Sequence, residues 1–148
     1  MTKFLSWIAV IFWMSLIFYF SHQPAAVSNE LSSGITEKTI ETIDKIVPTY
    51  DSKMERVNHI VRKNAHFLIY LVLGVFVVNA LKANGVRGYR RMGFALLICV
   101  LYAVSDEFHQ HFVEGRGPQV KDVMIDSTGA IVGICLFCLI CWIVKRKY

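Results

Sequence analysis

The fold is decided by residues 91–111, RMGFALLICVLYAVSDEFHQH, in which a long apolar run ends in a polar one. As a helix, Arg91 to Asp106 rises about 22 Å, whereas the hydrocarbon core of a bilayer is about 30 Å thick. The run crosses a membrane only if its helix continues through Ser105–Gln110. That continuation puts ionisable side chains below a membrane surface, where they are costly and usually line a protein interior, a wet cavity or a substrate path. We therefore look for function there.

Outward from this stretch, apolar residues come in blocks rather than at the period of a strand or of a soluble amphipathic helix. The chain of 148 residues is 55% hydrophobic, and the expected transmembrane segments are residues 4–20, 65–81, 92–110 and 122–144. In a bilayer, backbone polar groups must be bonded within a helix or a closed barrel, and no strand alternation is present. The sequence predicts an all-α polytopic membrane protein, a single domain of residues 1–148 with four transmembrane helices and an outer amphipathic helix.

The basic residues set the expected orientation. The formal net charge is +5, and cations gather near the N-terminus, between the second and third segments, and at the C-terminus. These cations are Lys3, Lys82, Arg87, Arg90, Arg91, Lys145, Arg146 and Lys147. Because short basic loops stay on the cytoplasmic side, we expect both termini in the cytoplasm. The basicity is a topology signal, and we expect no nucleic-acid partner.

Residues 21–64 form the expected outer segment. Residues 30–47 carry apolar side chains at helical spacing opposite a charged face, and Pro48 ends the run. We expect this amphipathic helix to lie at the outer interface or to cover the bundle. Nothing breaks a helix between Ser52 and Leu81, so the second transmembrane helix should begin outside the membrane. The four cysteines lie inside apolar segments, where free cysteine behaves as a small hydrophobe.

Three transmembrane segments place an ionisable residue at a similar depth. Counted from the basic flanks, His66 lies at about 24 Å, Asp106 at about 22 Å and Asp126 at about 28 Å. On each helix, further polar residues follow at spacings of three or four and share a face. We predict an outward-facing polar pocket with a basic rim. The predicted ligand-binding residues are Arg62, Lys63, His66, Tyr70, Tyr102, Asp106, Glu107, Gln110, Arg116, Asp122 and Asp126.

The spacing of these residues resembles a known family. Residues 63–74, KNAHFLIYLVLG, resemble the basic-x-x-His-Phe-x-x-Tyr-x-x-Leu-Gly pattern of VanZ-like proteins. Residues 102–133 resemble the second half of that family, with Tyr102, Asp106, Glu107, Gln110, Phe112, Arg116, Asp122, Asp126, Gly129, Ala130 and Gly133 in the matching positions. The chain departs from the family at Asp126, where an asparagine is common, and so adds a negative charge.

The resemblance implies a multi-pass protein of a bacterial cell membrane. It also implies that the protein makes the cell tolerant to teicoplanin and related lipoglycopeptide antibiotics without remodelling peptidoglycan precursors. It implies no particular reaction. The partners that we expect are membrane lipids and either a lipoglycopeptide or a lipid-linked envelope component, and a homodimer remains open.

Three roles for the pocket stay open at this point. It could bind a lipidic ligand, it could hydrolyse an outer-leaflet lipid or lipid phosphate, or its polar network could only fix the helix bundle. The candidate catalytic residues are His66, Asp106, Glu107 and Asp126, whose carboxyl and imidazole groups suit general acid–base work. His66 with Asp106 or Asp126 could also hold a divalent metal, but these spacings are weak signals. We therefore expect neither a metal nor a cofactor.

Overall fold

The computed structural model describes residues 3–24, 50–113, 117 and 119–147. Its elements are four helices: α1 Lys3–Ser21, α3 Tyr50–Ala83, α4 Gly88–Gln110 and α5 Val120–Lys147. The described residues contain no strand. Each helix contains a segment long and apolar enough to cross a membrane: Lys3–Ser21, Ile60–Ala83, Gly88–Gln110 and Val120–Arg146. The all-α prediction with four transmembrane helices is confirmed, and the chain is a multi-pass membrane protein. The expected amphipathic helix at residues 30–47 falls outside the described residues.

Two boundary predictions are confirmed. α4 continues through the polar residues to Gln110, as the length argument required. α3 is a single helix that begins at Tyr50, well before its apolar part starts near Ile60. The helices extend beyond the apolar blocks because backbone hydrogen bonding continues until a residue interrupts it, whatever the polarity of the side chains.

The turn between α3 and α4 shows how the sequence stops a helix. Gly85 has a φ of 87°, which an L side chain rarely adopts. The Val86 amide donates to the Leu81 carbonyl at 3.0 Å and the Gly85 amide donates to the Lys82 carbonyl at 3.1 Å. These are the two bonds of a Schellman motif, so α4 can turn back directly beside α3.

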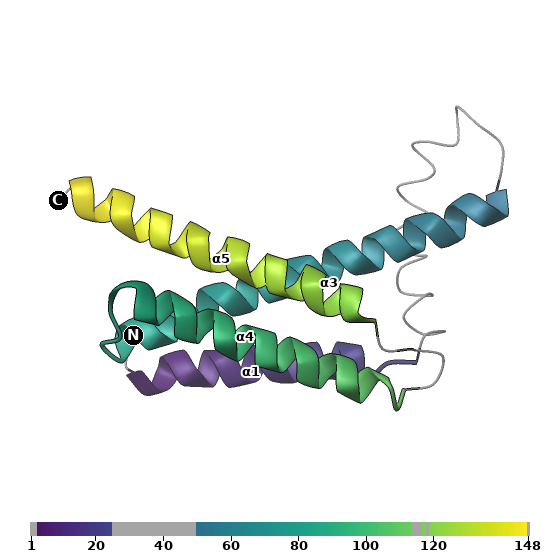
Figure 1. Ribbon diagram of the computed structural model, residues 1–148, viewed down its shortest axis with the longest axis horizontal. Coiled ribbons are helices and arrows are strands. Elements are labelled where there is room, and N and C mark those ends of the chain that lie inside the picture. The colour runs from purple at the N-terminus through teal and green to yellow at the C-terminus, as the bar shows by residue number, and fades with distance from the viewer. Residues whose placement is uncertain (1–2, 25–49, 114–116, 118, 148) are drawn as a thin grey trace.

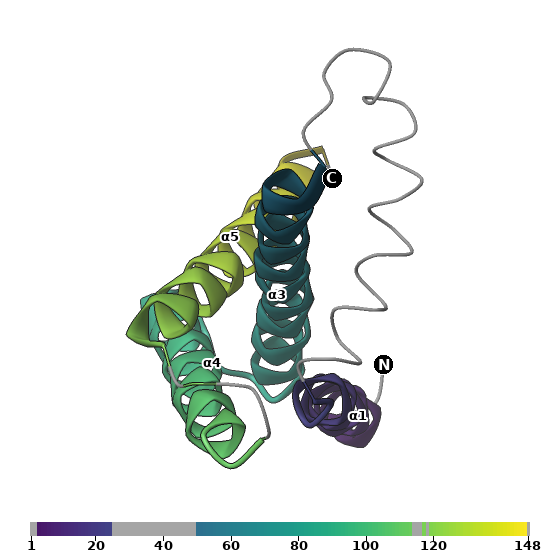
Figure 2. The same cartoon turned by 90° about the vertical axis from the view of Figure 1, so that its right-hand side faces the viewer.

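α3 is the central helix and contacts the other three, most extensively α5 (Figure 1; Figure 2). α3 and α5 cross at close range, while α1 and α4 run beside the C-terminal part of α3. α1 begins and α5 ends at the same end of the molecule (Figure 1). Large apolar side chains such as Phe4, Leu101 and Phe108 remain exposed on the outside of the bundle, where lipid would cover them in a membrane.

Small residues permit the close crossing of α3 and α5. A methyl group on Gly129 would overlap the Phe67 carbonyl, and one on Gly133 would overlap the Leu71 carbonyl. A methyl group on Gly74 would lie 2.5 Å from the Ala130 carbonyl oxygen. We call Gly74, Gly129 and Gly133 the glycine seam. The sequence predicted close contact through Gly129 and Gly133, and the seam confirms it.

Candidate functional site

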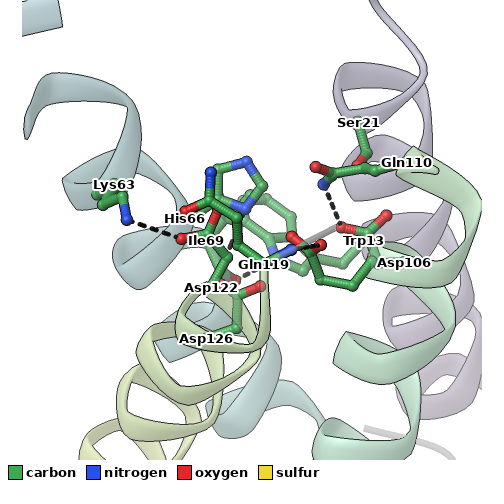
Figure 3. A network of polar contacts seen from close by, with 11 residues as sticks. Trp13, Ser21, Lys63, His66, Ile69, Asp106, Gln110, Gln119, Asp122 and Asp126 are labelled. Atoms are coloured by element: carbon green, nitrogen blue, oxygen red, sulfur yellow. Dashed lines mark hydrogen bonds and ion pairs between the residues drawn. The ribbon is translucent and has the colours of Figure 1, made fainter. Parts of the chain in front are cut away.

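The glycine seam brings the polar faces of α3 and α5 together. His66 directly precedes Phe67, the residue that Gly129 contacts, and Asp126 lies one turn before Gly129. The His66 Nδ1 lies 3.6 Å from the Asp126 Oδ1. One turn further out, the Lys63 Nζ lies 3.0 Å from the Asp122 Oδ1 (Figure 3). Two ion pairs therefore continue the α3–α5 contact beyond the seam.

α4 adds a third wall. Asp106 is 2% exposed and Asp126 is 1% exposed. One ligating atom from each of His66, Asp106 and Asp126 lies within 4.8 Å of the other two. The predicted convergence of three helices at His66, Asp106 and Asp126 is thus confirmed, and we call these three residues the triad.

Gln110 ties α4 to α1 beside the triad. Its Nε2 donates to the Ser21 Oγ at 2.6 Å and to the Asp106 Oδ2 at 3.3 Å (Figure 3). Ser21 is buried at the end of α1. Trp13, also on α1, donates from its Nε1 to the Ile69 carbonyl at 2.8 Å. α1 therefore holds the site from the side, a contribution that the sequence argument did not predict.

Glu107 has a different position from the triad. The Gln119 backbone amide donates to its Oε2 at 2.9 Å, just before α5 begins at Val120. A carboxylate at a helix N-terminus meets an amide that has no partner within the helix and the positive end of the helix dipole. Glu107 thus fixes where α5 starts, and with it the position of Asp122 and Asp126.

A pocket of about 90 Å³ lies between these helices. Six residues on the predicted ligand-binding list line it, namely Arg62, Lys63, His66, Gln110, Asp122 and Asp126, and Gly117, Gln119 and Ile125 complete the lining. Gln119 and Ile125 precede and follow Asp122 by three residues, so the helical period could have pointed to them. A water-sized ligand needs about 10–15 Å³ by this measure, so the pocket holds a small charged group and not a whole drug-sized molecule.

The other predicted ligand-binding residues lie apart from the pocket surface. Tyr70 and Asp106 are buried behind it. The Tyr102 hydroxyl donates to the Met14 carbonyl at 2.6 Å, so it binds α1 rather than the pocket. Glu107 contacts the start of α5 as described above, and Arg116 lies outside the described residues.

The charges around the pocket are not fully paired with one another. Lys63 is engaged by Asp122, whereas Arg62 has no ion-pair partner in the described part of the chain. The arrangement is therefore a cation at the pocket rim with acidic groups deeper in. Such a site can bind an anion at the rim and a cation at the base.

Comparison with known proteins gives one match. The model of the VanZ/LLP1 family matches residues 5–142, which include almost all of the four helices. No curated protein and no solved structure matches the chain. The resemblance inferred from residues 63–74 and 102–133 is confirmed by this match. The chain belongs to the VanZ/LLP1 family of membrane proteins.

Proposed function

We propose that this protein confers tolerance to teicoplanin and related lipoglycopeptides by binding the anionic group of a lipidic ligand in its polar pocket. The observation that carries the proposal is the pairing of a small pocket of about 90 Å³ with the rim cations Arg62 and Lys63. A phosphate or carboxylate fits such a volume, and guanidinium and ammonium groups recognise both. The tail of an amphiphile would stay in the bilayer beside the bundle.

The proposal includes an orientation. The loop between α3 and α4 carries Arg87 and Arg90, and α5 ends near Lys145 and Arg146. Both lie at the end of the bundle opposite the end of α4 and the start of α5 (Figure 1). The pocket residues Gln110, Gln119 and Asp122 belong to that second end. Since short basic loops remain in the cytoplasm, the pocket opens to the outside of the bacterial cell membrane, where lipoglycopeptides and outer-leaflet lipids are found.

A matched pair of charge variants tests the proposal. In a teicoplanin-sensitive host that expresses the chain, we expect Arg62→Gln with Lys63→Gln to return the inhibitory concentration to that of the host alone. Lys145→Gln with Arg146→Gln removes the same charge from the opposite end and should keep the tolerance. Equal tolerance in both double variants, at equal membrane abundance, would contradict the proposal. A glycopeptide of the same core without an acyl tail serves as the control antibiotic.

Direct binding then separates the two sources of the anion. Purified protein in neutral-lipid nanodiscs is titrated with teicoplanin or with phosphatidylglycerol. Binding of teicoplanin that depends on Arg62 and Lys63 identifies the antibiotic as the ligand, and binding of the lipid alone identifies the membrane. If neither binds, the pocket hypothesis fails.

Hydrolysis of a lipid ester or lipid phosphate is the second candidate function. It is favoured by the triad, in which an imidazole and two carboxyl groups face one another beside the pocket. Incubation with lipid-linked envelope substrates tests it. Product release that Asp106→Asn abolishes would establish turnover, and binding without product would reject it.

A further inference from the structure

We propose that His66, Asp106 and Asp126 bind one divalent transition-metal ion, Zn²⁺ or Mn²⁺, at the base of the pocket. The three residues come from α3, α4 and α5, and their ligating atoms lie within 4.8 Å of one another. This inference replaces the expectation of no metal, which rested on sequence spacing alone. It stands on the triad and does not require the lipidic ligand proposed above.

The distances are close to those of a coordinated ion. Two ligand atoms that each lie about 2.1 Å from a tetrahedral metal are roughly 3.4 Å apart. The His66 Nδ1 and the Asp126 Oδ1 are 3.6 Å apart, which is too long for a hydrogen bond. The ligating atom of Asp106 lies within 4.8 Å of both.

Buried atoms at the site indicate a ligand independently of the distances. The Asp106 Oδ1 and the Tyr70 hydroxyl are buried and have no hydrogen-bond partner among the described residues. The Asp126 Oδ1 is likewise buried without a hydrogen bond, and the His66 Nδ1 approaches it to 3.6 Å. Both aspartates are at least nine-tenths buried, and Tyr70 is fully buried. Buried polar atoms in native proteins are nearly always partnered by protein, water or an ion. A metal ion held by the triad would satisfy both carboxylate oxygens.

The donor set narrows the choice of metal. One imidazole nitrogen with two carboxylate oxygens suits Zn²⁺ and Mn²⁺, whereas Mg²⁺ and Ca²⁺ prefer oxygen ligands throughout. Three protein ligands leave at least one coordination position open, as in catalytic zinc sites. His66 and Asp126 also line the pocket, so an ion held by the triad would be next to a ligand bound in the pocket.

Charge balance supports a cation at this position. Two carboxyl groups within 4.8 Å of a shared imidazole repel each other in the low dielectric of a helix bundle. Lys63 does not relieve this repulsion because it pairs with Asp122. A divalent ion would neutralise both carboxylates at once and would change the local electrostatics more than any side chain nearby.

Metal binding to the purified full-length chain tests the proposal directly. After treatment with a chelator and dialysis in detergent, we expect the protein to bind one Zn²⁺ or Mn²⁺ per chain in calorimetry and elemental analysis. Asp106→Asn, Asp126→Asn and His66→Gln should each weaken the affinity by more than tenfold. The matched control is His111→Gln, the same chemical change as His66→Gln at an exposed residue outside the pocket and the triad, and it should bind as the unchanged chain does. Binding of less than a tenth of an ion per chain would overturn the proposal, as would equal losses in His111→Gln and His66→Gln.

A spectroscopic variant keeps the test decisive even where the weakened variants fold poorly. Co²⁺ replaces Zn²⁺ in many sites, and a cysteine ligand gives it an intense thiolate-to-cobalt charge-transfer band. His66→Cys should show this band on addition of Co²⁺, whereas the native chain, whose four cysteines lie outside the triad, should not. No band in a folded, monodisperse His66→Cys protein would overturn the assignment of His66 as a ligand. Because neither experiment contains lipid or antibiotic, their failure is distinct from failure of the proposed function.

Discussion

The two ends of the α3–α5 contact are built on opposite physical principles. At one end, the glycine seam lets backbone meet backbone with no side chain between. At the end nearer the start of α5, the same two helices meet through Lys63, His66, Asp122 and Asp126, which we call the charged end. Small residues alone allow two membrane helices to pack closely. The charged end adds ionisable groups that such packing does not require, and our functional proposals therefore concern the charged end.

The largest expected effect comes from removing the buried charges of the charged end. Replacing a buried ion pair by apolar side chains of similar volume is often neutral or stabilising by about 1–4 kcal/mol, whereas removing one partner is destabilising. We therefore expect His66→Met with Asp126→Leu to fold at least as stably as the native chain, measured by unfolding in detergent. Teicoplanin tolerance should be lost. His66→Met alone is the control. It leaves Asp126 without its partner and should therefore be less stable than the native chain.

The opposite pair of results would support a purely structural network. If the double variant unfolds more easily and cells that express it keep their tolerance, the charged end serves only to fix the helices.

The next effect concerns the seam. Gly133→Ala places a methyl group against the Leu71 carbonyl, which cannot move without shifting α3. Overpacking of this kind costs about 1–3 kcal/mol, so we expect the free energy of unfolding to fall by that amount. Gly93→Ala is the matched control, since nothing lies within 4 Å of the added methyl group. Equal stability of the two variants would show that the seam does not hold α3 against α5.

Much of the fold and of the candidate site could be predicted from the sequence. Apolar length gave the four helices, because the bilayer thickness fixes how long each must be. Depth counted from the basic flanks, together with polar residues that share one face of each helix, predicted the convergence of His66, Asp106 and Asp126. Residues at equal depth on neighbouring helices lie near one another when those faces point inward. These arguments need only the rise and the period of a helix.

The remaining contacts of the site depend on how each helix is rotated about its axis. The length of an apolar segment does not give this rotation. Ser21 and Trp13 carry no charge, and only the packing of α1 brings them to Gln110 and Ile69. Tyr102 shares a helical face with Asp106, yet its longer side chain reaches the Met14 carbonyl instead of the pocket. The sequence named His66 with Asp106 or Asp126 as possible metal ligands, but it could not show that their ligating atoms lie within 4.8 Å of one another, because the three residues stand on three helices whose rotation the spacing does not give.

A smaller effect separates the two tyrosines that lie near the triad. Tyr102→Phe removes a hydrogen bond to the Met14 carbonyl and should cost about 0.5–1.5 kcal/mol of unfolding free energy. Tyr70→Phe removes a buried hydroxyl that has no partner among the described residues, so it should leave stability unchanged or slightly raised. Thermal unfolding of the two variants side by side measures the contrast. If Tyr70→Phe lost more stability than Tyr102→Phe, the Tyr70 hydroxyl would have a partner within the folded chain.

The smallest expected effect tests the difference between the two ion pairs within the charged end. The Lys63 and Asp122 side chains are 23% and 26% exposed, whereas that of Asp126 is 2% exposed. Water and salt screen a partly exposed pair, which is worth at most about 1 kcal/mol, and the screening length falls from about 8 Å at 0.15 M to about 3 Å at 1 M salt. We expect Lys63→Met to lower the unfolding free energy by less than about 1 kcal/mol at low salt, with the difference vanishing at 1 M. The second pair joins a His66 side chain that is 19% exposed to the buried Asp126, so the loss caused by His66→Met should depend on salt less than the loss caused by Lys63→Met. An equal salt dependence of the two losses would contradict this contrast between the two pairs.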